Sequence, residues 1–386
     1  MVPLFLYKVY CCIVAMNRLF FDLIRVSLGI QKELRRTPSA EEWKTLYDLA
    51  KKQSLCGICS RGLQVLYKDA GYRDGIPETL FLKWIGFANI IKEKNRIVNK
   101  QCVLLKEHFS RHGFNCGIMK GQGLAALYRN GEVDLRLLRQ SGDIDVYVEG
   151  GRDKVQKHIN QLFGDCEYDY KNVHAPFFED TEVEVHWNPE ILMNLFYNYR
   201  LQNYWKEHAN DLISDVAVLP EGLGEINVPS LAVNRFYILL HTYRHAFDSG
   251  VGLRQVMDYY FVLRQDKDTA SRAETLRLVK EYGMTKFAAA LMWIMQEVFH
   301  LEEDYLLCGP DEKEGRFLLN EIMQSGNFGY YDVRVKEIGG HNKLRALATK
   351  LQRAPYLIKH YPMEVLWAPV WMLYHFIWKR TVGRLK

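Results

Sequence analysis

The segment Ser141–Val148 constrains the fold of this chain more than any other, because its polar and apolar residues alternate strictly. Successive side chains of a β-strand point to opposite faces, so Asp143 and Asp145 share one face and the apolar residues share the other. Two neighbouring carboxylates raise each other's pKa unless a cation lies between them. Mg²⁺ binds one or two carboxylates together with substrate phosphates. The segment is therefore either a half-buried strand with two solvated acids or part of a metal site.

An upstream segment, Gly117–Tyr128, favours the metal site. It has the pattern of a short apolar strand, a glycine-containing turn with Lys120, and a helix. The free N–H groups at a helix start attract anions, and a lysine adds a point charge that suits phosphate. We therefore expect Lys120 to contact a triphosphate; the alternative is a solvated lysine in a turn.

A downstream segment, Thr181–Trp187, adds a third acid. Its alternation places Glu182, Glu184 and His186 on one face of a second strand. A carboxylate on a neighbouring strand helps to hold two divalent ions about 3.5–4 Å apart. The turn, the Asp-x-Asp strand and the acidic strand thus follow one another as a phosphoryl-transfer site requires.

These segments resemble the polymerase-β-like nucleotidyltransferase superfamily, and in particular a branch of largely uncharacterised bacterial nucleotidyltransferases. The resemblance depends on the turn Lys120-Gly121, which stands where the wider superfamily has Gly-Ser, and on Glu184–Trp187. It also includes an arginine before the acids, either Arg139 or Arg136, which is a phosphate contact or a surface charge. Two later stretches, His241–His245 and Leu253–Asp258, look similar as well. The likeness covers roughly residues 40–300.

The resemblance implies a mixed sheet flanked by helices, two Mg²⁺ (or Mn²⁺) ions, and transfer of a nucleoside monophosphate from an NTP, ATP foremost, to an acceptor. It assigns Asp143, Asp145 and Glu184 as catalytic metal ligands, although Glu182 faces the same way and is an alternative to Glu184. The expected nucleotide-binding residues are Lys120, Gly121, Gln122, Arg139 and Ser141.

Histidines supply further candidates. His186 either hydrogen-bonds a ligating carboxylate or is a histidine satisfied within the sheet. His241 and His245 lie one helical turn apart, and they either contact substrate or pack against Asp258. Their spacing is that of a zinc-protease pair, but Thr242 stands where the glutamate of that motif belongs, so we exclude a protease.

Charge distribution narrows the class of acceptor. The net charge is +5, yet residues 331–386 alone carry 11 Lys or Arg and 3 acids, a local +8, so the remainder sums to −3. A near-neutral core offers no basic track for nucleic acid. We therefore expect a small molecule or a protein hydroxyl or phosphate as acceptor, and no nucleic acid.

The pattern of elements predicts an α+β fold: a helical region over 1–112, a small mixed-sheet core over 113–230, and a helical domain with a basic, aromatic tail over 231–386. The expected strands are 115–119, 143–148, 165–170, 173–178, 181–187 and 212–218. The expected helices include 81–109, 152–163, 231–247, 252–265, 268–282, 285–300, 311–324, 341–353 and 363–380.

The eight cysteines are scattered, which is typical of reduced thiols, and predicts a cytoplasmic protein. Cys56-x-x-Cys59 has no second pair to complete a zinc site, so we interpret it as two small apolar helix residues. Met1–Ala15 resembles a weak signal region without a clear cleavage site, and Met16 is an alternative start.

The C-terminal stripe Trp367, Trp371, Tyr374 and Trp378, followed by basic residues, either packs on a core or contacts an anionic membrane surface. Two non-enzymatic alternatives follow: a catalytically silent nucleotide-binding protein and a membrane-peripheral interaction protein. For the enzyme, Asp145→Asn should abolish pyrophosphate release and leave the melting temperature near or above wild type, because it removes one of several repelling charges.

Overall fold

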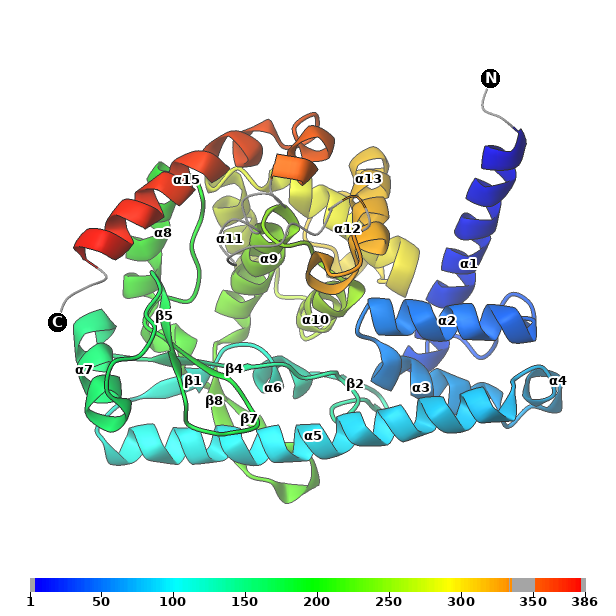
Figure 1. Cartoon of the computed structure of the whole chain (residues 1–386), viewed down its shortest axis with the longest axis horizontal. Helices are drawn as coiled ribbons and strands as arrows, with labels where there is room; N and C mark the ends of the chain where they lie inside the picture. The colour runs from blue at the N-terminus through cyan, green and yellow to red at the C-terminus, as the bar shows by residue number, and fades with distance from the viewer. Residues whose placement is uncertain (1–3, 333, 335–350, 383–386) are drawn as a thin grey trace.

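The chain is an α+β protein whose helices surround a small mixed sheet (Figure 1). The computed structural model describes residues 4–332, 334 and 351–382, with side chains from Ile13 onward. The described residues before Cys116 form helices and turns without a strand: α1 (Leu4–Leu28), α2 (Ala40–Lys52), α3 (Cys56–Leu66), α4 (Ala70–Arg73) and the long α5 (Glu78–Arg111).

The sheet has the order β1-β4-β6-β5, with β1 (Cys116–Ile118), β4 (Ile144–Val148), β5 (Asn172–Ala175) and β6 (Val183–His186). The two central strands, β4 and β6, are parallel, and each outer strand is antiparallel to its neighbour. Two hairpins accompany the sheet: β2 (Arg129–Asn130) with β3 (Val133–Asp134), and β7 (Asp215–Val218) with β8 (Glu225–Val228).

One face of the sheet is apolar and packs on helices. Ile144 and Val146 of β4 join a buried cluster with Leu105 of α5 and Ile159 of α7 (Gly151–Phe163). In Figure 1, α5 runs along this side of the sheet, and α7 lies near the C-terminal end of α5. The alternation predicted for β4 is therefore confirmed, and the acids of β4 lie on the opposite face.

The remaining helices form one core with the N-terminal helices. They are α6 (Gln122–Ala125), α8 (Leu195–Glu207), α9 (Leu231–Phe247), α10 (Leu253–Leu263), α11 (Thr269–Glu281), α12 (Thr285–Phe299), α13 (Glu312–Ser325) and α15 (Pro362–Thr381). A single buried cluster includes Phe20 of α1, Trp84 of α5, Phe236 of α9 and Met295 of α12. α9 is buried on almost every side, and it brings the C-terminal helices against the acidic face of the sheet.

Local sequence signals explain several boundaries. Ser39 caps α2 in a capping box with Glu42. Gly113, with φ +74°, follows the end of α5, where glycine is the usual residue. Cys56 and Cys59 are buried in α3 with free thiols, so their interpretation as apolar helix residues is confirmed.

Some predictions were wrong. No strand covers 165–170: the chain makes a single bridge from Tyr168 to Val173, because Asp169 N–H donates to the Asn172 carbonyl and reverses the chain. The predicted strand 173–178 ends at Ala175, since Pro176 has no N–H to donate. Missed elements are α8, β8 and the β2–β3 hairpin. Most of the predicted helix 341–353, like the basic residues Arg384 and Lys386, lies outside the described residues.

The C-terminal stripe packs on a core in part, and its contact with a membrane surface stays a prediction. On α15, Trp371 is buried against Tyr170 and joins a small cluster with Ile191 and Met193. The other side of the helix exposes a row of large apolar side chains: Met363, Leu366, Val370, Leu373, Phe376 and Ile377. Among the described residues, no helix has the combined length and apolar character needed to cross a bilayer.

Candidate active site

Asp145 and Glu184 lie directly opposite each other on the parallel strands β4 and β6. Ligand atoms of Asp145, Glu184 and His186 all lie within 4.8 Å of one another, close enough to share an ion. Asp143, immediately before β4, lines the same cavity. Glu182 instead points to an exposed edge, where it pairs with His174 at 2.6 Å. The strand register therefore places Glu184, and not Glu182, beside Asp143 and Asp145.

Two side chains, Lys120 and His186, contact the interior of the acidic cluster. Lys120 Nζ lies 2.7 Å from Asp145 Oδ1; the side chain of Asp145 is buried, and that of Lys120 is 13% exposed. His186 Nε2 lies 3.0 Å from Asp145 and 3.1 Å from Glu184. Burial opposes the charge on each partner, but these contacts hold the pKa of Asp145 well below its usual range and raise the pKa of His186. Of the two interpretations of His186, the contact with carboxylates is the one present.

Asp143 differs from the other two acids. It is exposed at the mouth of the cavity, and the charge of Asp145, together with the partial loss of water around the carboxylate, raises its pKa to about 6. The hydrogen bond from His186 and the charge of Lys120 offset the burial of Glu184 and lower its pKa to about 2. The unrelieved repulsion is thus concentrated on Asp143, where a bound cation would remove it.

The turn that carries Lys120 is only partly as predicted. Gly121 has φ +55°, a conformation that favours glycine, and lines the cavity. The helix that follows, α6, is a single turn of four residues, too short for a helix-end anion site. Gln122 is buried away from the cavity and donates to Asn99 of α5 at 2.6 Å, and Ser141 is not among the lining residues. Lys120 is mostly shielded from solvent and paired with Asp145, so the interpretation as a solvated lysine was wrong.

A second group of charges forms the opposite wall. Arg139 is buried and makes a double ion pair with Asp258 of α10, at 2.7 and 2.8 Å. It is therefore not a surface charge, while Arg136 pairs with Asp134 away from the cavity. Tyr128 donates to the same carboxylate at 2.6 Å.

Arg254, beside this pair, lines the cavity as well. Burial and the charge of Arg139 lower the pKa of Arg254, which means that the two guanidinium groups repel each other. An anion in the cavity would relieve that repulsion.

Glu190, which was not among the predicted site residues, is the centre of a third group. Its carboxylate is completely buried and lies 3.1 Å from Lys171 Nζ and 2.8 Å from His241 Nδ1, with Arg244 at 3.4 Å. The charges of Lys171 and Arg244, with the hydrogen bond from His241, hold the pKa of Glu190 well below its usual value despite burial. Glu190 follows β6 by four residues in an irregular segment, and no periodic pattern singles it out.

The predicted contact of His241 and His245 with Asp258 was wrong. His241 donates to Glu190 instead, and His245 contacts Ser249 at 3.1 Å, because Asp258 is already engaged by an arginine and a tyrosine. Burial and the charge of Lys120 lower the pKa of His241 to about 4, so its ring is neutral at pH 7. Both rings line the cavity, so a contact with substrate stays a prediction for them.

The three groups enclose one cavity of about 290 Å³ between the sheet and helices α9 and α10. Five cationic side chains line it: Lys120, Arg139, Lys171, Arg244 and Arg254. At its edge stands Phe328, 43% exposed and 5.7 Å from the Arg254 guanidinium. Acids at one end, cations along the wall and an exposed ring at the rim suit a metal-bound, phosphorylated aromatic ligand.

Comparison with known proteins gives one match. A family model described as "Uncharacterised nucleotidyltransferase" matches residues 39–300, more than half of the chain, and this span contains the three groups above. No curated protein and no solved structure matches the chain.

Proposed function

Since the chain belongs to this family of uncharacterised nucleotidyltransferases, we propose that it transfers a nucleoside monophosphate from a metal-bound NTP to a hydroxyl or phosphate of a small molecule or protein. Family membership supports a transferase with an NTP substrate. The observation that carries the finer proposal is the register of β4 and β6, which sets Asp145 opposite Glu184 at a cavity lined with cations. We further propose that the family is a branch of the polymerase-β-like nucleotidyltransferase superfamily.

The acidic residues fit a divalent metal. Asp143, Asp145 and Glu184 offer hard oxygen ligands on one side of one cavity, and the raised pKa of Asp143 marks a place where positive charge is missing. We propose that these three carboxylates hold Mg²⁺ or Mn²⁺, with His186 hydrogen-bonded to two of them. When bound, such ions activate the acceptor oxygen and neutralise the leaving pyrophosphate.

The chain's own side chains position the substrate. Arg139 and Arg254 lie where they can bind the triphosphate, and Lys120 is close enough to exchange its contact with Asp145 for a phosphate oxygen once a cation neutralises the acid. Phe328 offers a face on which a base can stack, with ATP as the proposed NTP. In the transfer, an acceptor oxygen bonds to the α-phosphorus while the bond to the bridging oxygen of pyrophosphate breaks. Such chemistry requires mainly positioning and charge stabilisation.

His241 and Glu190 form the acceptor side of the proposal. His241 is neutral and donates through Nδ1 to Glu190, so its Nε2 is left as a hydrogen-bond acceptor. Such a nitrogen can accept a hydrogen bond from a hydroxyl of the acceptor substrate and thereby orient it. The division into 1–112, 113–230 and 231–386 is part of this proposal: the middle region supplies the acids and Lys120, and the last supplies His241. The buried free cysteines support a cytoplasmic location.

The test is incubation of the full chain with each α-labelled NTP, Mg²⁺ or Mn²⁺, and a cell extract, followed by analysis of labelled products and of released pyrophosphate. We expect release that requires the metal and is lost in Glu184→Gln. The matched control is Glu182→Gln, two residues away on the same face but outside the cavity, which should stay active. Binding of Mg–NTP without pyrophosphate release would instead indicate a catalytically silent nucleotide-binding protein.

A further inference from the structure

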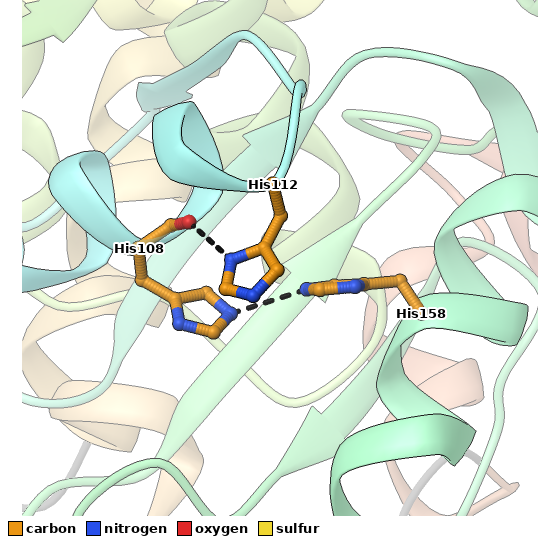
Figure 2. A group of neighbouring side chains, drawn as sticks. All are labelled: His108, His112 and His158. Carbon is orange, nitrogen blue, oxygen red and sulfur yellow. Dashed lines mark hydrogen bonds between the residues drawn. The ribbon is translucent and has the colours of Figure 1, made fainter.

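Three histidines meet on the face of the sheet opposite the acids. His108 and His112 lie one turn apart at the end of α5, and His158 faces them from α7 (Figure 2). Among the described residues, this trio and the trio of Asp145, Glu184 and His186 are the groups whose ligand atoms all lie within 4.8 Å. We propose that His108, His112 and His158 bind a borderline divalent transition-metal ion, Zn²⁺ foremost.

The distances between the rings suit a shared ion. The Nε2 atoms of His108 and His158 are 3.1 Å apart. Two nitrogens at 2.0–2.1 Å from a tetrahedral Zn²⁺ would be about 3.3 Å apart. The ring centroid of His112 lies 4.4 Å from that of His108 and 4.9 Å from that of His158. A small rotation of the exposed His112 side chain would bring all three nitrogens to bonding distance.

The hydrogen bonding of His112 prepares it as a ligand. Its Nδ1 lies 2.7 Å from the carbonyl oxygen of His108, and since a carbonyl only accepts, Nδ1 carries the proton. Nε2 therefore keeps its lone pair, and Figure 2 shows this nitrogen pointing toward the facing nitrogens of His108 and His158. Metal-bound histidines usually donate their second nitrogen to a carbonyl or carboxylate in this way.

The surroundings favour a metal over a purely structural packing of rings. Phe109 and Phe177 contact His108, and Phe114 contacts His158, which gives the site an apolar wall. Arg111, beside the cluster, is already paired with Glu107 at 2.7 Å. Three imidazoles without a carboxylate suit Zn²⁺, Cu²⁺ or Ni²⁺ rather than Mg²⁺. The exposed position of His112 leaves a fourth coordination position open to water.

Such an ion would join α7, which directly follows β4, to the end of α5. It would thereby fix the helices that cover the apolar face of the sheet, without touching the cavity. The site is thus separate from the proposed function, and each can fail without the other.

The test is a Zn²⁺ titration of full-length protein after removal of metals with a chelator, in excess Mg²⁺. The Asp145→Asn variant serves as a second background in which the acidic site is weakened. We expect one equivalent of Zn²⁺ in both proteins, and Co²⁺ in its place should give the visible absorption of a tetrahedral site. Loss of a residue that hydrogen-bonds a metal ligand lowers metal affinity 10–100-fold, and loss of a ligand itself should lower it more. We therefore expect His112→Ala to lower the affinity for Zn²⁺ by at least ~100-fold.

Two controls make the result decisive. His208→Ala removes a partly exposed histidine that pairs with Asp211 elsewhere on the surface, and it should bind Zn²⁺ as wild type does. His112→Ala should keep wild-type pyrophosphate release, because His112 is remote from the cavity. The proposal is refuted if no equivalent binds in the Asp145→Asn background, or if His112→Ala and His108→Ala both bind within threefold of wild type.

Discussion

Replacement of the two aspartates around β4 should change stability in opposite directions. Asp143 carries unrelieved repulsion, with its pKa raised from 3.8 to about 6 by Asp145 and by the partial loss of water around the carboxylate. In a fully buried group, a rise of this size corresponds to about 3 kcal/mol. Since Asp143 stands exposed at the cavity mouth, solvent screens much of this, and we expect Asp143→Asn to stabilise the metal-free protein by about 1 kcal/mol at pH 7.5.

Asp145→Asn should have the opposite effect, which reverses the expectation from the sequence. Asp145 is buried and paired with Lys120 at 2.7 Å, so the substitution leaves a mostly shielded ammonium without its counter-charge. Removal of one partner of a buried ion pair costs about 3–5 kcal/mol, and the remaining amide oxygen should keep the loss near the lower end, about 3 kcal/mol. Both variants should still lose pyrophosphate release.

The assay is equilibrium denaturation in chelator-containing buffer, at pH 7.5 and at pH 4.5. An acid whose folded pKa is raised destabilises the fold above that pKa, and the penalty disappears as pH falls toward the unfolded value. The advantage of Asp143→Asn should therefore be full above pH 6 and shrink at pH 4.5. Equal destabilisation by both substitutions, or a gain for Asp143→Asn that persists unchanged at pH 4.5, would refute this account of the charges.

Four further outcomes are expected. The affinity for Mg–NTP should fall as pH drops through about 6, because a protonated Asp143 binds no cation. Titration calorimetry at several pH values measures this affinity, and the Asp143→Asn variant should lack the pH dependence. Glu190→Gln should lower the free energy of unfolding by about 3–5 kcal/mol in urea denaturation, since Lys171 and its neighbours lose their buried counter-charge; no measurable loss would contradict this. Phe328→Leu should raise KM for the NTP about fivefold with kcat unchanged, as expected for about 1 kcal/mol of lost stacking, whereas an unchanged KM would remove the stacking role. Leu373→Gln with Ile377→Gln, both on the exposed face of α15, should reduce co-sedimentation with anionic vesicles if that face meets a membrane, and equal partitioning of variant and wild type would argue against it.

The sequence was most informative where periodicity and burial agree. The alternation around Asp145 and Glu184 predicted both strands and the face that carries the acids, because a two-residue period on a half-buried sheet leaves few other arrangements. The two-residue strands β2 and β3 were missed, since two residues are too few to show a period.

Side-chain partners were much harder to predict than strands. That Arg139 binds Asp258, and that Glu190 gathers Lys171 and His241, depends on how α9 and α10 pack against the sheet. These contacts join residues far apart in the chain, and no local pattern encodes them. The histidines of α5 were overlooked for a similar reason, because an isolated pair one turn apart becomes a cluster only when α7 supplies the third ring.

The parallel pairing of β4 with β6 also restricts how related chains can vary in length. A register slip of one residue would place Val183 or Val185 opposite Asp145. It would also turn the Glu184 side chain into the hydrophobic core between the sheet and its helices. Insertions and deletions should therefore collect in the surface turn 176–182, where the chain can lengthen without changing which side chains meet, and should be absent from the strands themselves.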